Sequence, residues 1–290
     1  MEIPLMNEPI ETEDFREMRK AACLTIAGSD SGGNAGVQAD LRAFHCFGVH
    51  GCTVFTALTA QNPFGVEAAL AVSPEFVQQQ LQAVLEPYAI NALKTGMLAT
   101  AEVALAVSET LELHPRITKV VDPVMVATSG APLLEDDAIE IVCEKLLPVA
   151  SLMTPNIPEA EILAESGKID SWETMAENAK RLADRYGCAV LLKGGHGTLP
   201  AQDALFDGKC LYRISTPVVE APVSTHGTGC SLSAAIAASA ACGESMLDAV
   251  IAGKAYVYES IRTGTLVGDA ASVMGTPQRI PVEAVRVETL

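Results

Sequence analysis

The chain reads Ser224-Thr-His-Gly-Thr-Gly-Cys-Ser231 directly before the small-residue run Leu232-Ser-Ala-Ala-Ile-Ala237. The run contains no helix breaker and predicts a helix, so the glycines lie in a loop at its N-terminus. Unpaired backbone N–H groups and the positive end of the helix dipole face outward there, and glycines let an anion approach the main chain. The stretch therefore predicts an anion site at Gly227, Thr228 and Gly229.

Cys230 follows these glycines, in the first turn of the predicted helix. A helix N-terminus lowers the pKa of a thiol, which predicts a thiolate able to accept a proton beside the bound anion. The alternative is a capped helix with a small buried cysteine. This stretch alone leaves both interpretations open.

Apolar runs typical of strands alternate with helical segments along the rest of the chain. Strands are predicted over residues 23–27, 52–60, 92–95, 119–121, 152–154 and 189–192, and a hairpin over 204–214. Helices are predicted over residues 37–47, 73–85, 100–113, 135–147, 171–186, 231–241 and 245–262, with a further helix start near 156–159. This alternation predicts an α/β domain with a mostly parallel sheet covered on both faces.

Ligands of such sheets gather at the carboxyl ends of the strands. The residues at or just after these ends are Gly28, Gln61, Met97, Asp122, Asn156 and Lys193. A lysine, acids and a glycine-rich helix start on one rim fit phosphoryl transfer best, because a transferring phosphoryl group needs positioning and charge neutralisation.

Asp122, Asn156 and Glu159 carry oxygen atoms of the kind that Mg²⁺ prefers, directly or through its waters. Asn156 and Glu159 lie three residues apart at a helix start. The same pair is also typical of helix capping, and Lys193 would also fit a solvated strand end. The sequence leaves these alternatives open.

Composition excludes several classes of protein. The 290 residues are 49% hydrophobic and 19% charged, which indicates a packed globular chain, and the net charge of −17 argues against a nucleic-acid partner. The eight cysteines form no CxxC pair, so we expect free thiols in a reducing cytoplasm. No apolar run approaches the ~20 residues that span a membrane. Motifs of dinucleotide-binding proteins, P-loop enzymes, serine hydrolases and zinc enzymes are also absent from the sequence.

The domain organisation is predicted from composition and element order. Residues 1–20 are acidic and are expected to form a mobile leader. Residues 21–262 are expected to form a single domain, and residues 263–290 have mixed composition and no predicted role.

Eight segments occur together in the order of a known family. They are Leu24-Thr-Ile-Ala-Gly-Ser-Asp30, Ala35-Gly-Val-Gln-Ala-Asp-Leu41, Thr56-Ala-Leu-Thr-Ala-Gln-Asn62, Lys94-Thr-Gly-Met-Leu98, Val121-Asp-Pro-Val-Met125, Thr154-Pro-Asn-Ile-Pro-Glu159, Lys193-Gly-Gly-His196 and Thr225-His-Gly-Thr-Gly-Cys-Ser231. With them the chain resembles the hydroxymethylpyrimidine and phosphomethylpyrimidine kinases of thiamine biosynthesis, within the ribokinase-like superfamily.

The resemblance implies a three-layer α/β/α domain, a homodimer and Mg²⁺-dependent use of ATP. It implies two successive phosphorylations, first of 4-amino-5-hydroxymethyl-2-methylpyrimidine and then of its monophosphate. By motif match, Gln61 would read the aminopyrimidine edge, since an amide offers both a donor and an acceptor. Gly28, Asp40 and Met97 would line the same pocket.

The resemblance also assigns the phosphate side of the site. Gly227, Thr228 and Gly229 would form the anion hole over the transferred phosphoryl group, and Cys230 would accept the hydroxyl proton in the first step. ATP would contact Lys193 and Asn156, and also Lys254, whose match is less secure. Asp122, Asn156 and Glu159 would hold Mg²⁺ and its waters.

The chain departs from the family pattern at two places. Asn34 stands where a glycine is common, and the usual closing segment of glycines and histidines is absent after Arg262, which bears on recognition of the nucleotide base. The nearest alternative is a pyridoxal kinase of the same superfamily, from which Gln61 would discriminate. A non-catalytic pyrimidine or nucleotide sensor is the third interpretation, and the full set of candidate catalytic residues argues against it.

Overall fold

The computed structural model describes residues 19–125, 134–195, 201–269 and 271–290. Its strands are β1 (Ala22–Asp30), β2 (His50–Asn62), β3 (Gly65–Ala71), β4 (Ile90–Thr95), β5 (Thr118–Val121), β6 (Leu152–Met153), β7 (Ala189–Lys193), β8 (Gln202–Phe206), β9 (Leu211–Ser215), β10 (Thr265–Val267), β11 (Ala271–Val273) and β12 (Arg286–Thr289). The predicted strands and the predicted hairpin are confirmed.

One large sheet organises the described part of the chain. It has ten strands in the order β12-β9-β8-β7-β6-β5-β4-β1-β2-β3, and β10 pairs with β11 separately. The central run from β2 through β1, β4, β5 and β6 to β7 is parallel, whereas β3, β8, β9 and β12 pair antiparallel. The predicted α/β fold with a mostly parallel sheet is therefore confirmed.

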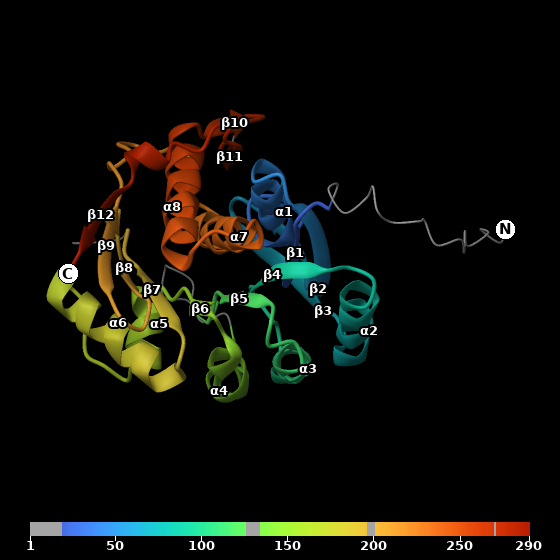
Figure 1. Cartoon of the computed structure of the whole chain (residues 1–290). Coiled ribbons are helices and arrows are strands. Elements are labelled where there is room, and N and C mark those ends of the chain that lie inside the picture. Colours follow the sequence, from blue (N-terminus) through green and yellow to red (C-terminus); the bar gives the residue numbers. More distant parts are fainter. Residues whose placement is uncertain (1–18, 126–133, 196–200, 270) are drawn as a thin grey trace.

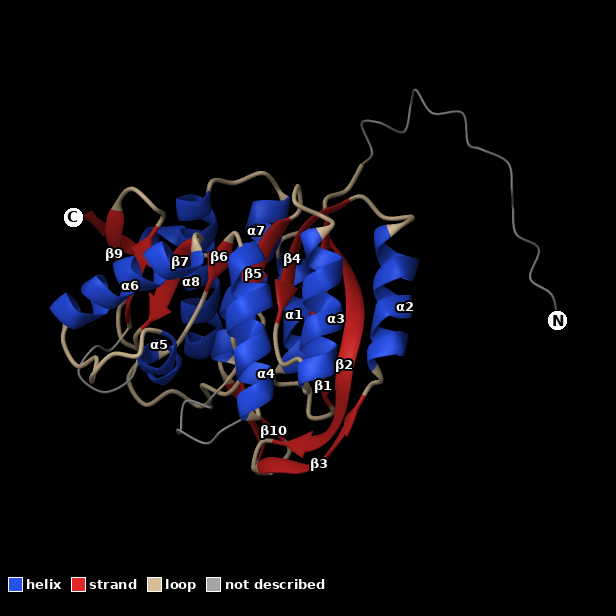
Figure 2. Ribbon diagram, turned by 90° about the horizontal axis from the view of Figure 1, so that it is seen from below, coloured by secondary structure: helices blue, strands red, loops and turns tan. Residues whose placement is uncertain are grey.

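Helices cover both faces of this sheet (Figure 1). They are α1 (Gly36–Cys46), α2 (Pro74–Leu85), α3 (Ala101–Glu112), α4 (Asp136–Ile141), α5 (Ile157–Leu163), α6 (Trp172–Tyr186), α7 (Thr228–Ala241) and α8 (Met246–Arg262). α1, α7 and α8 lie on one face, and α2 to α6 lie on the other, where Figure 2 shows α2, α3 and α4 side by side. Three layers result, with an apolar core on each face of the sheet.

Local sequence explains several of the helix boundaries. Ser73 and Ser171 accept hydrogen bonds from the backbone N–H groups of Phe76 and Thr174, as expected of N-caps. The single helix predicted over residues 135–147 is wrong in part. It is α-helical only to Ile141 and continues as a π turn and a 3₁₀ turn, because Pro148 has no N–H to extend an α-helix.

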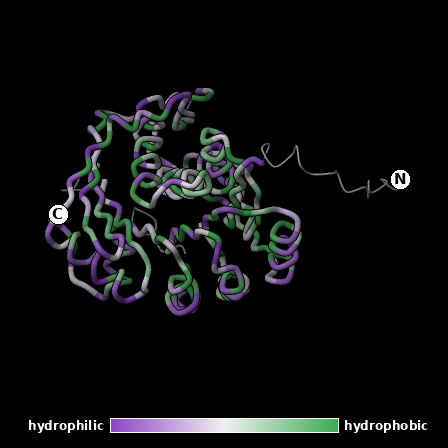
Figure 3. The backbone as a smooth tube through the Cα atoms, viewed as in Figure 1, coloured by the Kyte–Doolittle hydropathy of each residue, from purple (hydrophilic) through white to green (hydrophobic). Residues whose placement is uncertain are grey.

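α7 is the most buried helix beside the sheet. Its side chains from Ala234 to Ala238 are completely buried, and Figure 3 shows few strongly hydrophilic residues along it, in contrast to the outer helices. Small side chains allow close packing: a Cβ at Gly253 of α8 would lie 2.6 Å from Cγ1 of Ile236. The N-terminus of α7 is thereby held at the carboxyl ends of the parallel strands.

Four strands were not predicted: β3, β12 and the separate pair β10 and β11. β3 is exposed at every residue and so lacks the alternation of a half-buried strand. β12 pairs with the edge strand β9, which brings the end of the 263–290 segment into the central sheet. The predicted domain boundaries stay a prediction, and the predicted leader lies almost entirely outside the described residues.

The expectations about the cysteines and about membrane spans can be compared with the structure. All eight cysteines lie in the described residues and are free. Within the described ranges, no helix has the length and apolar character needed to cross a membrane.

The capping contact at the start of α6 yields a stability prediction. Replacing Ser171 with Ala removes an acceptor for the Thr174 N–H and should lower the free energy of unfolding by about 1 kcal/mol. Urea denaturation would measure this. Ser166→Ala is the matched control, since Ser166 is half-buried and its hydroxyl donates to the neighbouring Gly167 carbonyl and caps no helix, and its effect should stay within about 0.5 kcal/mol.

Candidate active site

Two glycine-containing loops meet at the carboxyl edge of the sheet. We call residues 31–36 the first loop and residues 224–229 the second loop. Gly227 has φ of +88°, and a Cβ there would overlap the carbonyl oxygen of Asn34. Gly36 has φ of +58°, and a Cβ there would overlap the carbonyl oxygen of Gly28. The main chains touch directly, so both positions require glycine.

The N-terminus of α7 faces a lysine and an aspartate. Lys193, the last residue of β7, places Nζ 2.9 Å from Oδ1 of Asp122, which follows β5. The same Nζ lies 3.5 Å from the position that a Cβ on Gly229 would occupy, and Oδ2 of Asp122 lies 3.7 Å from it. The structure therefore brings Gly227, Thr228, Gly229, Lys193 and Asp122 together, as the order of strand ends predicted.

Lys193 stays protonated in this setting. Burial lowers its pKa, but the carboxylates of Asp122 and Glu159 more than offset burial and raise the pKa overall. A fixed positive charge beside outward-facing N–H groups is suited to a phosphate group.

Asn156 and Glu159 form a capping box at the start of α5. Oδ1 of Asn156 accepts from the Glu159 N–H at 2.9 Å, and Oε2 of Glu159 accepts from the Asn156 N–H at 2.8 Å. Oε1 of Glu159 accepts from the Met125 N–H at 3.1 Å, and burial raises the pKa of this carboxyl. The capping interpretation is confirmed for both residues, and their metal-binding role stays a prediction.

The described residues fit Mg²⁺ that is held by few protein ligands together with substrate phosphates and water. In the described part of the chain, no three His, Cys, Asp or Glu side chains cluster as a metal-binding group. Mg²⁺ in phosphoryl-transfer sites is commonly held by one or two carboxylates together with substrate phosphates and water. Asp122 lies beside the candidate anion site, is only 4% exposed and suits that arrangement. Glu159 lies near enough to Asp122 that the Asp122 charge raises the pKa of Glu159.

The predicted lowering of the Cys230 pKa is wrong. Cys230 is half-buried in the first turn of α7, and burial raises the pKa of its thiol above the usual value. Lys94 opposes that effect, and Asp40 and Asp122 add to it. Loss of solvent around the thiolate therefore outweighs the nearby positive charge of Lys94, a balance that the local sequence does not contain.

A buried ion pair lies beside Cys230 that sequence reasoning missed. Nζ of Lys94 in β4 lies 2.9 Å from Oδ2 of Asp40 in α1, and both side chains are 0% exposed. The Thr25 hydroxyl donates to the same Oδ2 at 2.6 Å. Asp40 was expected to contact substrate; here its carboxylate faces Lys94 and Thr25. The signal available in the sequence was a lysine inside an otherwise apolar strand.

Lys254 is also engaged inside the protein. Its Nζ lies 2.6 Å from Oδ2 of Asp203, whose Oδ1 accepts from the Gly194 N–H. This contact links α8 to β8, where Asp203 is paired with Lys193 of β7. The ATP contact predicted for Lys254 stays a prediction, and His196 of the quoted family segment lies outside the described residues.

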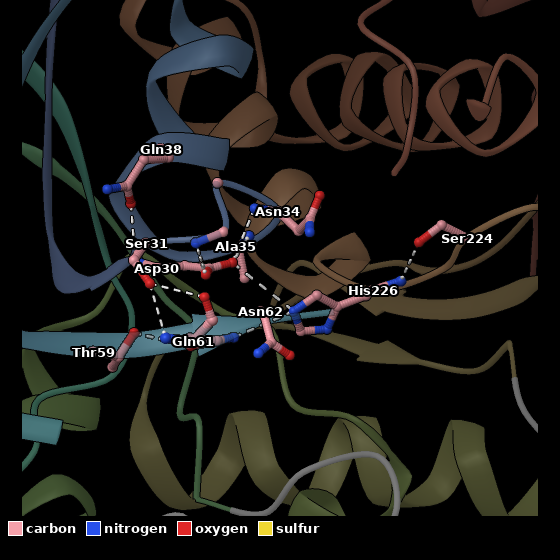
Figure 4. Close-up of polar contacts among 12 residues, drawn as sticks. Asp30, Ser31, Asn34, Ala35, Gln38, Thr59, Gln61, Asn62, Ser224 and His226 are labelled. Atoms are coloured by element: carbon pink, nitrogen blue, oxygen red, sulfur yellow. Dashed lines mark hydrogen bonds and ion pairs between the residues drawn. The ribbon is translucent and has the colours of Figure 1, made fainter. Parts of the chain in front are cut away.

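The opposite end of the site is formed by Gln61, His226 and Asp30 (Figure 4). Oε1 of Gln61 accepts from the Thr59 hydroxyl at 3.1 Å, and Nε2 of Gln61 lies 3.3 Å from Nε2 of His226. Met97 packs on Gly28, near the end of β1: its Cε lies 2.6 Å from where a Cβ on Gly28 would sit. Gln61, Gly28 and Met97 are thus on the rim where a substrate pocket was predicted.

Fold and site together define a small-molecule kinase of the ribokinase-like class. The model of the phosphomethylpyrimidine kinase family matches residues 30–274. The chain therefore belongs to the phosphomethylpyrimidine kinase family.

Individual relatives support this assignment. A hydroxymethylpyrimidine/phosphomethylpyrimidine kinase of Rhizobium meliloti is 45% identical over 242 residues, which cover 83% of this chain and 90% of the relative. A bifunctional thiamine biosynthesis protein of Geobacter sulfurreducens is 44% identical over 250 residues, and the chain spans about half (51%) of its length.

Solved structures agree with the fold. The pyridoxal kinase of Staphylococcus aureus in complex with AMP-PCP and pyridoxal has a TM-score of 0.81 at 32% identity, covering 94% of this chain and 99% of the other. A phosphomethylpyrimidine kinase of Clostridium difficile has a TM-score of 0.75 at 37% identity, covering 83% and 100%.

The buried ion pair yields a second stability prediction. Replacing Lys94 with Met leaves the Asp40 carboxylate buried without a countercharge and should lower the free energy of unfolding by about 3–5 kcal/mol. Urea denaturation would measure this. Arg279→Met is the control, because the Arg279–Glu283 pair is exposed and should contribute less than about 1 kcal/mol. Equal effects of both substitutions would contradict the electrostatic explanation.

Proposed function

We propose that this protein transfers the γ-phosphoryl group of ATP to 4-amino-5-hydroxymethyl-2-methylpyrimidine and then to the resulting monophosphate, on the route to thiamine diphosphate. One observation carries the proposal: the N-terminus of α7, Lys193 and Asp122 meet at the same sheet edge as Gln61. A phosphate site and an amide that matches an aminopyrimidine thus share one rim. Relatives named as kinases of these two substrates support it.

The phosphate side would work by positioning and charge. Backbone N–H groups at Gly227, Thr228 and Gly229 would receive the transferring phosphoryl oxygens, and protonated Lys193 would neutralise ATP phosphates. Bound Mg²⁺, held by Asp122 with ATP phosphates and water, would neutralise further negative charge. Asn156 and Glu159 would support that arrangement from the start of α5.

Cys230 would accept the proton of the substrate hydroxyl in the first phosphorylation. Its thiol adjoins the anion site, and Lys94 and Lys193 both favour the thiolate. The second acceptor is a phosphate monoester, which is already anionic near neutral pH and needs no such base. The two steps therefore differ in their dependence on one side chain.

Pyridoxal is the second candidate acceptor. Solved pyridoxal kinases match the chain over most of its length, which favours keeping it in any assay. Gln61 favours the aminopyrimidine, since its amide complements a ring nitrogen and an exocyclic amino group at once.

We also propose a homodimer that acts in the cytoplasm. β3 forms an edge of the sheet; Val66 and Leu70 in β3 are 57% and 67% exposed, and Phe64, just before β3, is 77% exposed. Apolar side chains gathered on a strand edge favour association with a second copy. Eight free cysteines fit a reducing compartment, and the net charge of −17 disfavours nucleic acid.

A parallel assay tests the proposed function. Phosphoryl transfer from Mg·ATP to hydroxymethylpyrimidine, its monophosphate and pyridoxal would be followed by separating products according to charge. Formation of the pyrimidine mono- and diphosphates with little pyridoxal phosphate supports the proposal. Predominant pyridoxal phosphate supports the second candidate, and no transfer to any acceptor contradicts both.

The role of Cys230 predicts a difference between the two steps. Cys230→Ala should lower kcat/KM for the first phosphorylation by about 10²–10⁴-fold and leave the second within a few-fold. Cys242→Ala is the matched control, because Cys242 is exposed at the far end of α7. Equal losses in both steps would count against Cys230 as the base.

The raised pKa of Cys230 predicts a pH dependence. Only the thiolate accepts a proton, and a pKa above the usual value leaves little thiolate at neutral pH. The rate of the first phosphorylation should therefore rise with pH above neutrality, whereas the rate of the second should not follow it. Rate–pH profiles for the wild type and Cys230→Ala would show this, and a parallel rise in the variant would rule the explanation out.

A further inference from the structure

We propose that His226 is a specificity-determining residue that holds the Gln61 amide in one orientation, so that the amide selects an acceptor ring with an amino group beside a ring nitrogen. The inference rests on the proposed function. It assigns a task to a residue outside the phosphate site, and Figure 4 shows the contacts that carry it.

The Gln61 amide is held at both of its ends. Its Oε1 lies 3.1 Å from the Thr59 hydroxyl, whose one proton it shares with the Ser29 carbonyl oxygen at 2.8 Å, and its Nε2 lies 3.3 Å from Nε2 of His226. A primary amide has two N–H donors and an oxygen with two lone pairs. In the His226 tautomer whose Nε2 accepts, these contacts use one donor and one lone pair, which leaves one donor and one acceptor for a ligand.

The backbone of Gln61 is held as well. Its N–H donates to the Ser31 hydroxyl, and that hydroxyl donates to the Gln61 carbonyl oxygen, both at 2.8 Å. Gln61 is thereby tied to the first loop, and only its side chain remains to be oriented.

His226 is held by the same two loops. Its backbone N–H donates to the Ser224 hydroxyl at 3.3 Å, and the next residue, Gly227, packs against the Asn34 carbonyl. Its ring Nε2 lies 4.0 Å from Oδ2 of Asp30. The same ring nitrogen therefore faces both Asp30 and Gln61, and it reaches the amide from the loop that carries the candidate anion site.

Asp30 gives this arrangement a rigid base. Its carboxylate accepts backbone N–H groups of Gly32, Asn34 and Ala35 at 2.8, 2.9 and 2.8 Å, and its side chain is 3% exposed. Three such bonds fix a carboxylate in place. His226, whose side chain is 45% exposed, thus approaches Gln61 beside a fixed charge.

The orientation of the amide decides which ring it can bind. A ring nitrogen beside an exocyclic amino group presents one acceptor and one donor, which pair with the remaining N–H and C=O of Gln61. Turning the amide by 180° would place donor against donor and acceptor against acceptor. In the tautomer whose Nε2 accepts from the Gln61 N–H, His226 opposes that rotation.

Substitution of His226 tests the role directly. KM and kcat would be measured with saturating Mg·ATP for 4-amino-5-hydroxymethyl-2-methylpyrimidine and for the analogue without the 4-amino group. His226→Leu removes the acceptor, and we expect its KM for the aminopyrimidine to rise about tenfold, the effect of roughly one lost hydrogen bond. Its kcat and its KM for the analogue should change less than about threefold.

Two further variants separate orientation from loop structure. His226→Gln again offers an acceptor near the position of Nε2 and should recover most of the lost discrimination. In a Gln61→Ala background, His226→Leu should leave the ratio of the two KM values unchanged, because the amide that it orients is gone. Thr225→Ala, at an exposed neighbour in the second loop, is the matched control and should leave the ratio of the two KM values unchanged.

The outcomes are distinct. An equal rise of KM for both acceptors, or a further loss of discrimination in the Gln61→Ala background, would overturn the inference. Calorimetric binding of the aminopyrimidine without ATP separates it from the proposed function. Binding without transfer by the wild type would overturn the proposed function alone, and the variants would then be compared by Kd. A wild type that does not bind the pyrimidine overturns both.

Discussion

The contact between the two glycine loops is the constraint on which the site depends. A Cβ at Gly227 would overlap the Asn34 carbonyl, and one at Gly36 would overlap the Gly28 carbonyl. Because no side chain separates these segments, the start of α7 comes up against the ends of β1 and β2. The candidate anion site and the candidate substrate rim become neighbours through this contact, although nearly 200 residues of chain separate the first loop from the second.

The alanine-rich helix α7 and the buried ion pairs both help to fix the groups at the carboxyl ends of the strands. Small side chains let α7 sit close to the sheet, with its N-terminus at the strand ends. Lysines then meet carboxylates beneath the surface: Lys94 pairs with Asp40, Lys193 with Asp122 and Lys254 with Asp203. Each pair joins residues of different helices, strands or strand ends, so the positions of these charges are fixed by the packing of the fold.

Prediction from the sequence succeeded where the causes are local or periodic. Apolar runs located the parallel strands, Ser73 and Ser171 marked helix starts, and the order of strand ends brought Asp122, Lys193 and the second loop together. It failed where pairing is remote. β3 is fully exposed, and β12 pairs with β9 across about 70 residues, so neither carries its own signal.

The sequence by itself determined the α/β fold, the family and the candidate residues of a phosphate site, because periodicity, caps and glycine spacing are written along the chain. Only the tertiary structure decided the state of those residues. Burial raised the pKa of Cys230 against the expectation from its helix position, Asp40 turned to Lys94, and His226 came to rest beside Gln61. Desolvation and contacts between distant segments exist only once the chain has folded, so no local pattern encodes them.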